Sequence, residues 1–264
     1  MVAILARMSA ESASPQPPAV DPDAPAVILS PHLDDAVWSC FAILSGDAPV
    51  EVATIFAGIP PAEPGWWDRQ CGITDSAEHV RDRRAEDTAV LASLGRRARH
   101  LPLLDDQYRD APVPAERVVE ELVRALPAVS RAYAPGGIGD HPDHLIGRDA
   151  GLLLARLGVP TTLYADYCYC TREGWPTWVA ENGRPEADEQ WRRVLGAALG
   201  DRIARPDVHR LSEPQSEAKL AAMRGYRTQF ENIEAEEPRW QVDGKGSADP
   251  EKRVIEVYYP LPAA

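Results

Sequence analysis

The sequence predicts a three-layer α/β/α sandwich with a mostly parallel, Rossmann-like sheet. Between residues 26 and 168, short apolar runs alternate with segments of helical length. Such alternation is typical of βαβ units, in which helices connect parallel strands and cover both faces of the sheet. In addition, two clusters of His and Asp residues follow apolar runs, as ligand-binding residues do at the carboxyl edge of open α/β sheets.

The strands and helices are expected in a regular order along the chain. Ala26-Val27-Ile28-Leu29 is the clearest buried strand, because it is apolar throughout. Ser76 provides a polar start for a helix that Gly95 would end, and Pro114 suits the first turn of another. We therefore expect strands at 26–31, 50–57, 98–103, 131–134, 161–168 and 254–259, and helices at 36–46, 77–94, 115–127, 142–157, 188–199 and 213–229.

The composition fits one globular domain and excludes several classes of protein. Residues 1–25 are expected to form a flexible N-terminal arm, because 6–25 are rich in Pro, Ala, Ser and Asp, and residues 26–264 a single domain. A formal net charge of −13 argues against binding to nucleic acid. No run approaches about 18 consecutive apolar residues and no signal peptide is recognised, so we expect a cytoplasmic protein without a membrane anchor. The sequence does not predict its oligomeric state.

Two polar clusters have the spacing of a metal site. The first, Pro31-His32-Leu33-Asp34-Asp35, places a His and an Asp three residues apart at a strand-to-helix turn. The second, His141-Pro142-Asp143-His144, places two imidazoles three residues apart on one face of a helix start. Ligands from His, Asp and His with one open position are the pattern of a catalytic zinc site, and a spare carboxylate can act as general base. The alternative for each cluster alone is an ordinary helix start capped by Asp.

Together these residues resemble the PIG-L/LmbE-like N-acetylglucosaminyl deacetylase family, whose signatures are (P/A)H-x-D-D after the first strand and H-x-D-H after a later one. A weaker similarity is Arg83-Arg84-Ala85-Glu86, which resembles the family's R-x-x-E helix. Another is Lys219 to Gln229, which resembles its K-x-x-A…Y-x-S-Q segment, with Thr228 in place of Ser. The resemblance covers about residues 26–230 and implies the α/β/α fold of a zinc-dependent amidohydrolase.

The resemblance implies a role for each matching residue of the two motifs. Asp34 would be the general base, and His141 would orient the reacting groups or protonate the leaving amine. Asp143 would be the carboxylate that orients a catalytic His. The ion would be either zinc or iron, because sites built from His and Asp hold both. The metal ligands would be His32, Asp35 and His144.

The expected substrate-binding residues lie outside these motifs. The resemblance places Arg83 towards a small-molecule substrate and lets Asp105 or Asp106 hydrogen-bond sugar hydroxyls. Trp66 and Trp67, in a long loop at 58–74, form either a wall for the substrate or part of a loop packed onto its own core. The segment just before the second motif lacks the Tyr that some members use as an oxyanion donor, so that donor is absent or comes from elsewhere.

Three functions are compatible with these residues. The first is hydrolysis of an acetyl or related acyl amide on an amino sugar or small-molecule conjugate, for example in secondary metabolism. The second uses the same metal site for a non-hydrolytic acid–base step on a pathway intermediate. The third is a non-catalytic metal-binding protein, against which Asp34 argues, because a bound metal does not require that residue. We favour the first.

Overall fold

The computed structural model describes residues 16–229 and 254–262, and a seven-stranded sheet forms the centre of these residues. The strands are β2 (Ala26–Ser30), β3 (Val50–Thr54), β4 (Arg97–His100), β6 (Ala132–Pro135), β7 (Thr161–Tyr164), β8 (Asp207–Arg210) and β9 (Ile255–Pro260). Their order in the sheet is β4-β3-β2-β6-β7-β9-β8. Neighbouring strands from β4 to β7 are parallel, whereas β9 is antiparallel to both β7 and β8. The predicted mostly parallel sheet is confirmed.

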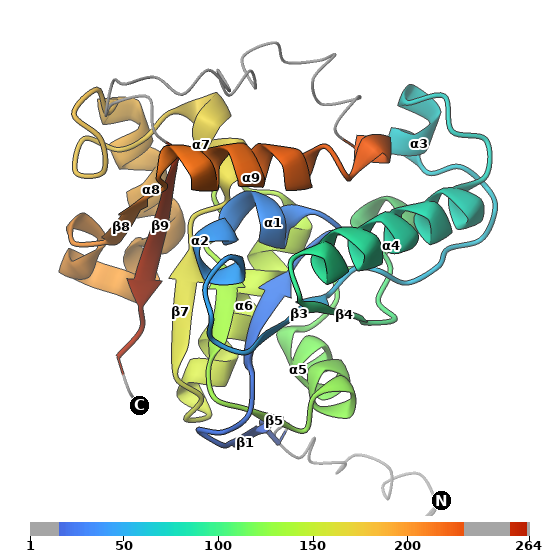
Figure 1. Cartoon of the computed structure of the whole chain (residues 1–264), viewed down its shortest axis with the longest axis horizontal. Helices are drawn as coiled ribbons and strands as arrows, with labels where there is room; N and C mark the ends of the chain where they lie inside the picture. The colour runs from blue at the N-terminus through green and yellow to red at the C-terminus, as the bar shows by residue number, and fades with distance from the viewer. Residues whose placement is uncertain (1–15, 230–253, 263–264) are drawn as a thin grey trace, which may run out of the picture.

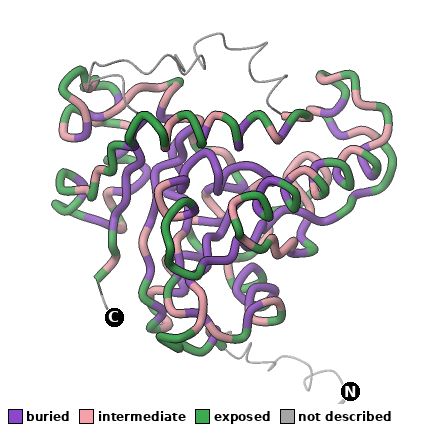
Figure 2. The backbone as a smooth tube through the Cα atoms, in the orientation of Figure 1, coloured by how far each residue is buried: buried purple, intermediate pink, exposed green. Residues whose placement is uncertain are grey.

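Helices cover both faces of this sheet (Figure 1). On one face lie α1 (Asp35–Ser39), α2 (Phe41–Leu44), α4 (Ser76–Ser93) and α9 (Glu213–Met223), and on the other α5 (Ala115–Ala125), α6 (Pro142–Arg156) and α8 (Pro185–Leu199). Ile28 belongs to the same buried cluster as residues of α1, α4 and α9, whereas its neighbour Leu29 belongs to the cluster that includes residues of α5, α6 and α8. Successive side chains of a strand point to opposite faces, so the uninterrupted apolar run of β2 is buried on both sides (Figure 2). Of the helices described, none is both long and apolar enough to pass through a bilayer.

The order of the strands creates a crevice at the carboxyl ends of β2 and β6. From β2 the chain continues to β3 and β4 on one side, and it later returns to β6 and β7 on the other side of β2. In open α/β sheets, ligands bind outside the carboxyl ends of two neighbouring strands whose connections leave in opposite directions. The His32–Asp35 cluster follows β2 and the His141–His144 cluster follows β6. The topology therefore brings the two clusters to one position.

The helix expected at 36–46 is divided at Cys40 into α1 and α2. The buried carboxylate of Glu256 accepts hydrogen bonds from the backbone N–H groups of Phe41 and Ala42, at 2.9 and 2.8 Å. These N–H groups would otherwise donate to carbonyl groups of the preceding turn. A contact with a strand near the end of the chain therefore interrupts the helix, and no local pattern predicts it.

The strand expected at 161–168 was too long. It ends at Tyr164 and is followed by α7 (Tyr167–Glu173), a helix that the sequence analysis did not predict. The sequence Tyr-Cys-Tyr-Cys from residue 167 alternates in size as a strand would. The structure instead buries Tyr167 and Cys170, three residues apart, as one face of a helix.

The domain begins earlier than residue 26. Within the predicted arm, β1 (Ala19–Val20) pairs in parallel with β5 (Ala128–Val129), and the N–H of Asp21 donates to the carbonyl oxygen of Val129 at 3.1 Å. This pairing uses backbone groups alone, so the composition of the arm does not reveal it. Residues 1–15 of the predicted arm lie outside the described residues.

Candidate metal centre and active-site cleft

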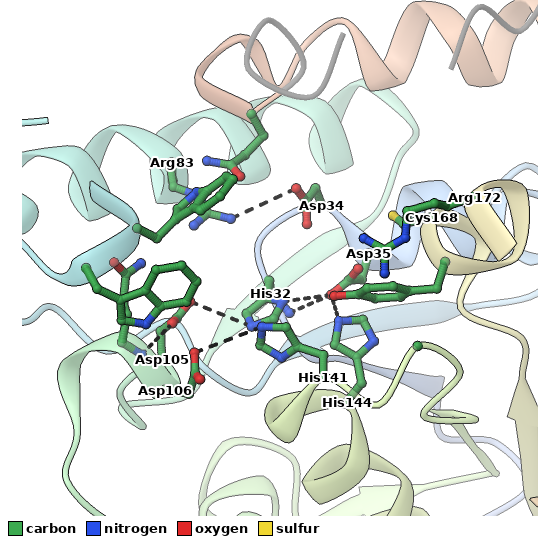
Figure 3. A pocket seen from close by; sticks show the side chains of 16 residues that line it. His32, Asp34, Asp35, Arg83, Asp105, Asp106, His141, His144, Cys168 and Arg172 are labelled. Carbon is green, nitrogen blue, oxygen red and sulfur yellow. Dashed lines mark hydrogen bonds and ion pairs between the residues drawn. The ribbon is translucent and has the colours of Figure 1, made fainter. Parts of the chain in front are cut away.

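A cavity of about 450 Å³ opens at the carboxyl ends of β2 and β6. Figure 3 shows both predicted clusters at this cavity. His32, Asp34 and Asp35 come from the turn after β2, and His141 and His144 come from the start of α6. Motifs that lie far apart in the sequence thus form the walls of a single site.

Hydrogen bonds fix the turn that carries the first cluster. The hydroxyl of Ser30 donates to the carbonyl oxygen of His32 at 2.7 Å and accepts from the N–H of Ala36 at 3.0 Å. The N–H of His32 donates to the carboxylate of Asp35 at 2.9 Å. Ser30 and Asp35 therefore close the turn before α1 and hold His32 beside Asp35.

Three ligand atoms converge in the cavity. Asp35 Oδ2 lies 3.3 Å from His32 Nδ1 and 3.3 Å from His144 Nε2. A tetrahedral ion with bonds of about 2.0–2.1 Å requires ligand atoms about 3.3 Å apart. The three residues also form one of the His/Asp groups in the described part of the chain whose geometry suits a metal ion. The donor set therefore fits one divalent ion.

The second ring nitrogen of each of these imidazoles lies within hydrogen-bond distance of a buried carboxylate. His32 Nε2 is 3.0 Å from Asp143 Oδ2, and His144 Nδ1 is 2.6 Å from Asp166 Oδ1. Metal-binding histidines usually donate their second N–H to such a partner, which fixes the tautomer and the orientation of the ring. The carboxylate of Asp143 thus contacts His32, a predicted ligand, and not His141.

Asp166, the partner of His144, is a site residue that the sequence patterns did not predict. Its second oxygen accepts a hydrogen bond from the N–H of Ile138 at 2.8 Å, which connects the end of β7 to the loop before α6. The strand predicted at 161–168 includes Asp166, whereas β7 ends at Tyr164 and Asp166 follows it. The rule that ligand-binding residues follow parallel strands would have found it, had the strand been ended correctly.

The buried carboxylates of the cluster favour the presence of positive charge in the cavity. Burial opposes protonation of His144, but the carboxylates of Asp35 and Asp166 raise its pKa to about 9. Burial likewise opposes protonation of His32, but Asp143 and Asp35 raise its pKa well above the usual value. Burial opposes ionisation of Asp35, yet His144 and His32 hold its pKa well below the usual range. A divalent ion would supply the positive charge in place of the two imidazole protons.

Asp34 lines the cavity but belongs to none of the candidate metal groups among the described residues. Burial and the neighbouring Asp35 raise the pKa of Asp34 to about 6, although Arg83 favours its ionised form. Arg83 Nη2 lies 3.9 Å from Asp34 Oδ2. A carboxyl group with a pKa close to neutrality is suited to accept and return a proton.

His141 is held in one tautomer by the start of α6. As the N-cap of this helix, it accepts at Nδ1 a hydrogen bond from the backbone N–H of Asp143, at 3.2 Å. Nε2 of the neutral imidazole therefore carries the proton, and it lies 4.0 Å from Asp106 Oδ1. Burial and the positive charges of His32 and His144 lower the pKa of His141 to about 3. His141 can thus donate a hydrogen bond while it stays uncharged.

The residues predicted to bind the substrate also line the cavity: Arg83, Asp105, Asp106, Trp66 and Trp67. Asp105 Oδ2 lies 3.6 Å from His32 Nε2, so this carboxylate stands directly beside the ligand group. Arg83 is buried and has Asp34 as an acidic neighbour. The structure therefore brings every predicted site residue to the cavity or, for Asp143, to the layer immediately behind it.

The loop that carries the two tryptophans is anchored and still faces the cavity. Trp66 and Trp67 begin α3 (Trp66–Gln70), their ring centroids are 5.8 Å apart, and Trp66 is 50% exposed. The buried carboxylate of Asp68 accepts hydrogen bonds from the hydroxyls of Ser76 and Tyr108, the latter at 2.7 Å. The two alternatives for this loop are thus combined, because it packs onto the protein through Asp68 and presents both indoles to the cavity.

Tyr169 of α7 is a second cavity residue that the sequence analysis missed. Its ring centroid lies 5.2 Å from that of His144 and 6.4 Å from that of His141. Gly139 makes this approach possible, because a Cβ there would lie 2.2 Å from the Tyr169 ring, and its φ of 90° also favours glycine. Tyr169 thus brings a phenol beside the two histidines from an element other than the second motif.

Comparison with known proteins agrees with this site. Residues 27–154 match the family model described as "PIG-L: GlcNAc-PI de-N-acetylase". The structure of the A40926 pseudoaglycone deacetylase Dbv21 is similar, with 27% sequence identity, a TM-score of 0.67 and coverage of 92% of this chain and 98% of that chain. A triple mutant of a deacetylase involved in the teicoplanin biosynthetic pathway has 25% identity, a TM-score of 0.68 and coverage of 91% and 99%. No curated protein sequence matched the chain. The resemblance inferred from the motifs is confirmed.

Proposed function

We propose that this chain, whose residues 27–154 match the PIG-L family model, is a divalent-metal-dependent deacetylase that acts on an N-acylated amino sugar. The observation that carries the proposal is the convergence of His32, Asp35 and His144 on one position, with Asp34 beside them. A non-catalytic metal protein needs the three ligands but not a buried carboxyl group with a pKa of about 6 in the same cavity.

We propose zinc as the ion, held by His32 Nδ1, Asp35 Oδ2 and His144 Nε2. Two imidazoles and one carboxylate with an open position are the usual donors of catalytic zinc. Nothing among the described residues favours iron. When bound, the ion would supply Lewis-acid polarisation of the amide carbonyl and lower the pKa of water.

The protein side chains handle the protons. Asp34 accepts a proton from the attacking water, and its raised pKa allows it to return that proton to the leaving amine. His141 donates from Nε2 to the carbonyl oxygen as negative charge develops there. The hydroxyl of Tyr169 offers a second donor, beside the imidazole of His141. Arg83 keeps Asp34 in place and contacts the substrate.

The proposed substrate is an N-acetylated or N-acylated amino sugar carried on a larger molecule, such as a glycopeptide of secondary metabolism. Two similar structures, of at least 25% identity, are a deacetylase of the A40926 pseudoaglycone and a deacetylase of the teicoplanin biosynthetic pathway. The walls of the cavity include the carboxylates of Asp105 and Asp106, suited to sugar hydroxyls, and the indoles of Trp66 and Trp67, suited to an apolar part of the substrate.

The test is product analysis with zinc-loaded protein. The substrates are the N-acetylated pseudoaglycones of A40926 and teicoplanin and a simple N-acetylglucosaminide. Equal amounts of acetate and free amine, abolished by a chelator and restored by zinc, are expected. Conversion of a substrate without release of an acid would instead support a non-hydrolytic acid–base reaction at the same site. Stoichiometric zinc without any conversion would favour a metal-binding protein.

A further inference from the structure

We infer that Arg109 is a positioning residue for the metal centre, acting through Asp143 on His32. Arg109 does not line the cavity, so it does not touch the substrate or the reacting groups. This inference rests on the proposed metal site, and the contacts that carry it lie behind that site.

Asp143 is a fully buried carboxylate with several donors around it. Its Oδ1 is ion-paired with Arg109 Nη2, and its Oδ2 accepts the backbone N–H of Asp106 at 3.1 Å and faces His32 Nε2 at 3.0 Å. A buried carboxylate without a positive partner is strongly destabilising. Among the described residues, Asp143 forms ion pairs with two side chains, His32 and Arg109.

Metal binding makes this partnership necessary. An imidazole that ligates a metal is neutral, so His32 cannot then balance the charge of Asp143. Arg109 keeps its charge, which lets Asp143 remain an anion and accept the Nε2–H of His32. That hydrogen bond leaves the lone pair of His32 Nδ1 on the side of Asp35, where it would be available to an ion.

Arg109 is itself held rigidly. Its Nη1 donates to the carbonyl oxygen of Leu104 at 2.6 Å, and its guanidinium carbon lies 4.6 Å from the centroid of the Phe56 ring. The Phe56 ring in turn lies 6.3 Å from that of His32. A planar guanidinium that stacks on a ring and makes two polar contacts has little rotational freedom. It therefore fixes the carboxylate of Asp143 in one orientation.

The inference is tested by the zinc affinity of the apoprotein, measured by competition with a chromophoric chelator. Arg109→Gln should weaken zinc binding by about 10- to 100-fold, the range for losing an outer partner of a ligand. Arg109→Lys keeps the charge but loses the planar, stacked group, so it should restore only part of the affinity. Arg99→Gln is the matched control, because Arg99 pairs with Glu51 at 2.6 Å on the edge strand β4, and it should bind zinc as the wild type does.

A double-mutant cycle separates action through Asp143 from a general structural effect. Asp143→Asn alone and Asp143→Asn with Arg109→Gln should bind zinc equally weakly and give the same absorption spectrum with Co²⁺. Additive losses would overturn the inference, as would unchanged affinity in Arg109→Gln. If Arg109→Gln does not fold, the two Asp143→Asn proteins decide the matter by the same comparison. A wild type that binds no zinc would refute the proposed function itself, which is a distinguishable failure.

Discussion

Replacement of Asp166 by Asn changes one atom behind the proposed metal site and should weaken the binding of zinc by His144. The carboxylate accepts from two donors, His144 Nδ1–H and the N–H of Ile138, at 2.6 and 2.8 Å. An amide has one oxygen and can accept from only one of them. If that oxygen stays with Ile138, the amide NH₂ donates to His144 Nδ1, and the imidazole proton moves to Nε2, the atom that should bind the ion.

To bind zinc, the variant must turn its amide oxygen to His144, which leaves the NH₂ group facing the N–H of Ile138. A buried donor without an acceptor costs about 1–3 kcal/mol. At about 1.4 kcal/mol per tenfold change in affinity, zinc binding should weaken by about 5- to 150-fold.

The assay is chelator competition on apoprotein, with circular dichroism and a thermal melt to confirm the fold. Asp149→Asn is the control, because this exposed carboxylate pairs with Arg148 on α6 away from the cavity. Zinc affinity within about twofold of the wild type in a folded Asp166→Asn protein would refute the reasoning, since twofold is well below the weakening estimated from the lost hydrogen bond. In that case either Asp166 does not orient His144 or His144 is not a ligand.

Four further outcomes are expected. Asp34→Asn should keep its zinc and lose about 10²- to 10⁴-fold in turnover, measured as acetate release, because the general base is gone; full activity would contradict the mechanism. In the wild type, kcat/KM should fall as the pH drops below about 6, because Asp34, whose pKa is raised to about 6, must be ionised to accept a proton, and a profile flat down to pH 4 would contradict this. Zinc binding to the apoprotein near neutral pH should release about two protons, from His32 and His144, as measured by calorimetry in buffers of different ionisation enthalpy, and no release would contradict the charge analysis. Trp66→Ala should raise KM for a glycopeptide substrate with little change in kcat. A fall in kcat with an unchanged KM would show that the indole does not bind substrate.

The central part of the fold and of the site follows from local patterns. The buried strand β2 is apolar from Ala26 to Leu29. The polar residues after β2 and β6 must meet because parallel strands end at one edge. The proposed ligands His32, Asp35 and His144 therefore follow from spacing and a family resemblance, without knowledge of tertiary contacts.

The residues behind the ligands could not be predicted in the same way. Asp166 lies within the predicted strand 161–168, which is longer than β7, so it did not stand out as a residue at the end of a strand. Arg109 reaches Asp143 through the path of the loop after β4. Glu256, whose hydrogen bonds divide the helix at Cys40, lies on β9, far from that helix in the sequence. Each of these is a single tertiary contact that leaves no periodic signal, so sequence patterns reveal the ligands more readily than the groups that hold them.

The central claim is that His32, Asp35 and His144 would hold one ion in a site that hydrolyses an amide, and the most direct measurement couples zinc content to acid release. Wild-type protein should carry about one zinc per chain, as expected of a single catalytic site, and should release acetate and amine in equal amounts. His144→Ala should be folded, lose the zinc and release neither. A folded His144→Ala protein that keeps both zinc and acetate release would contradict the account.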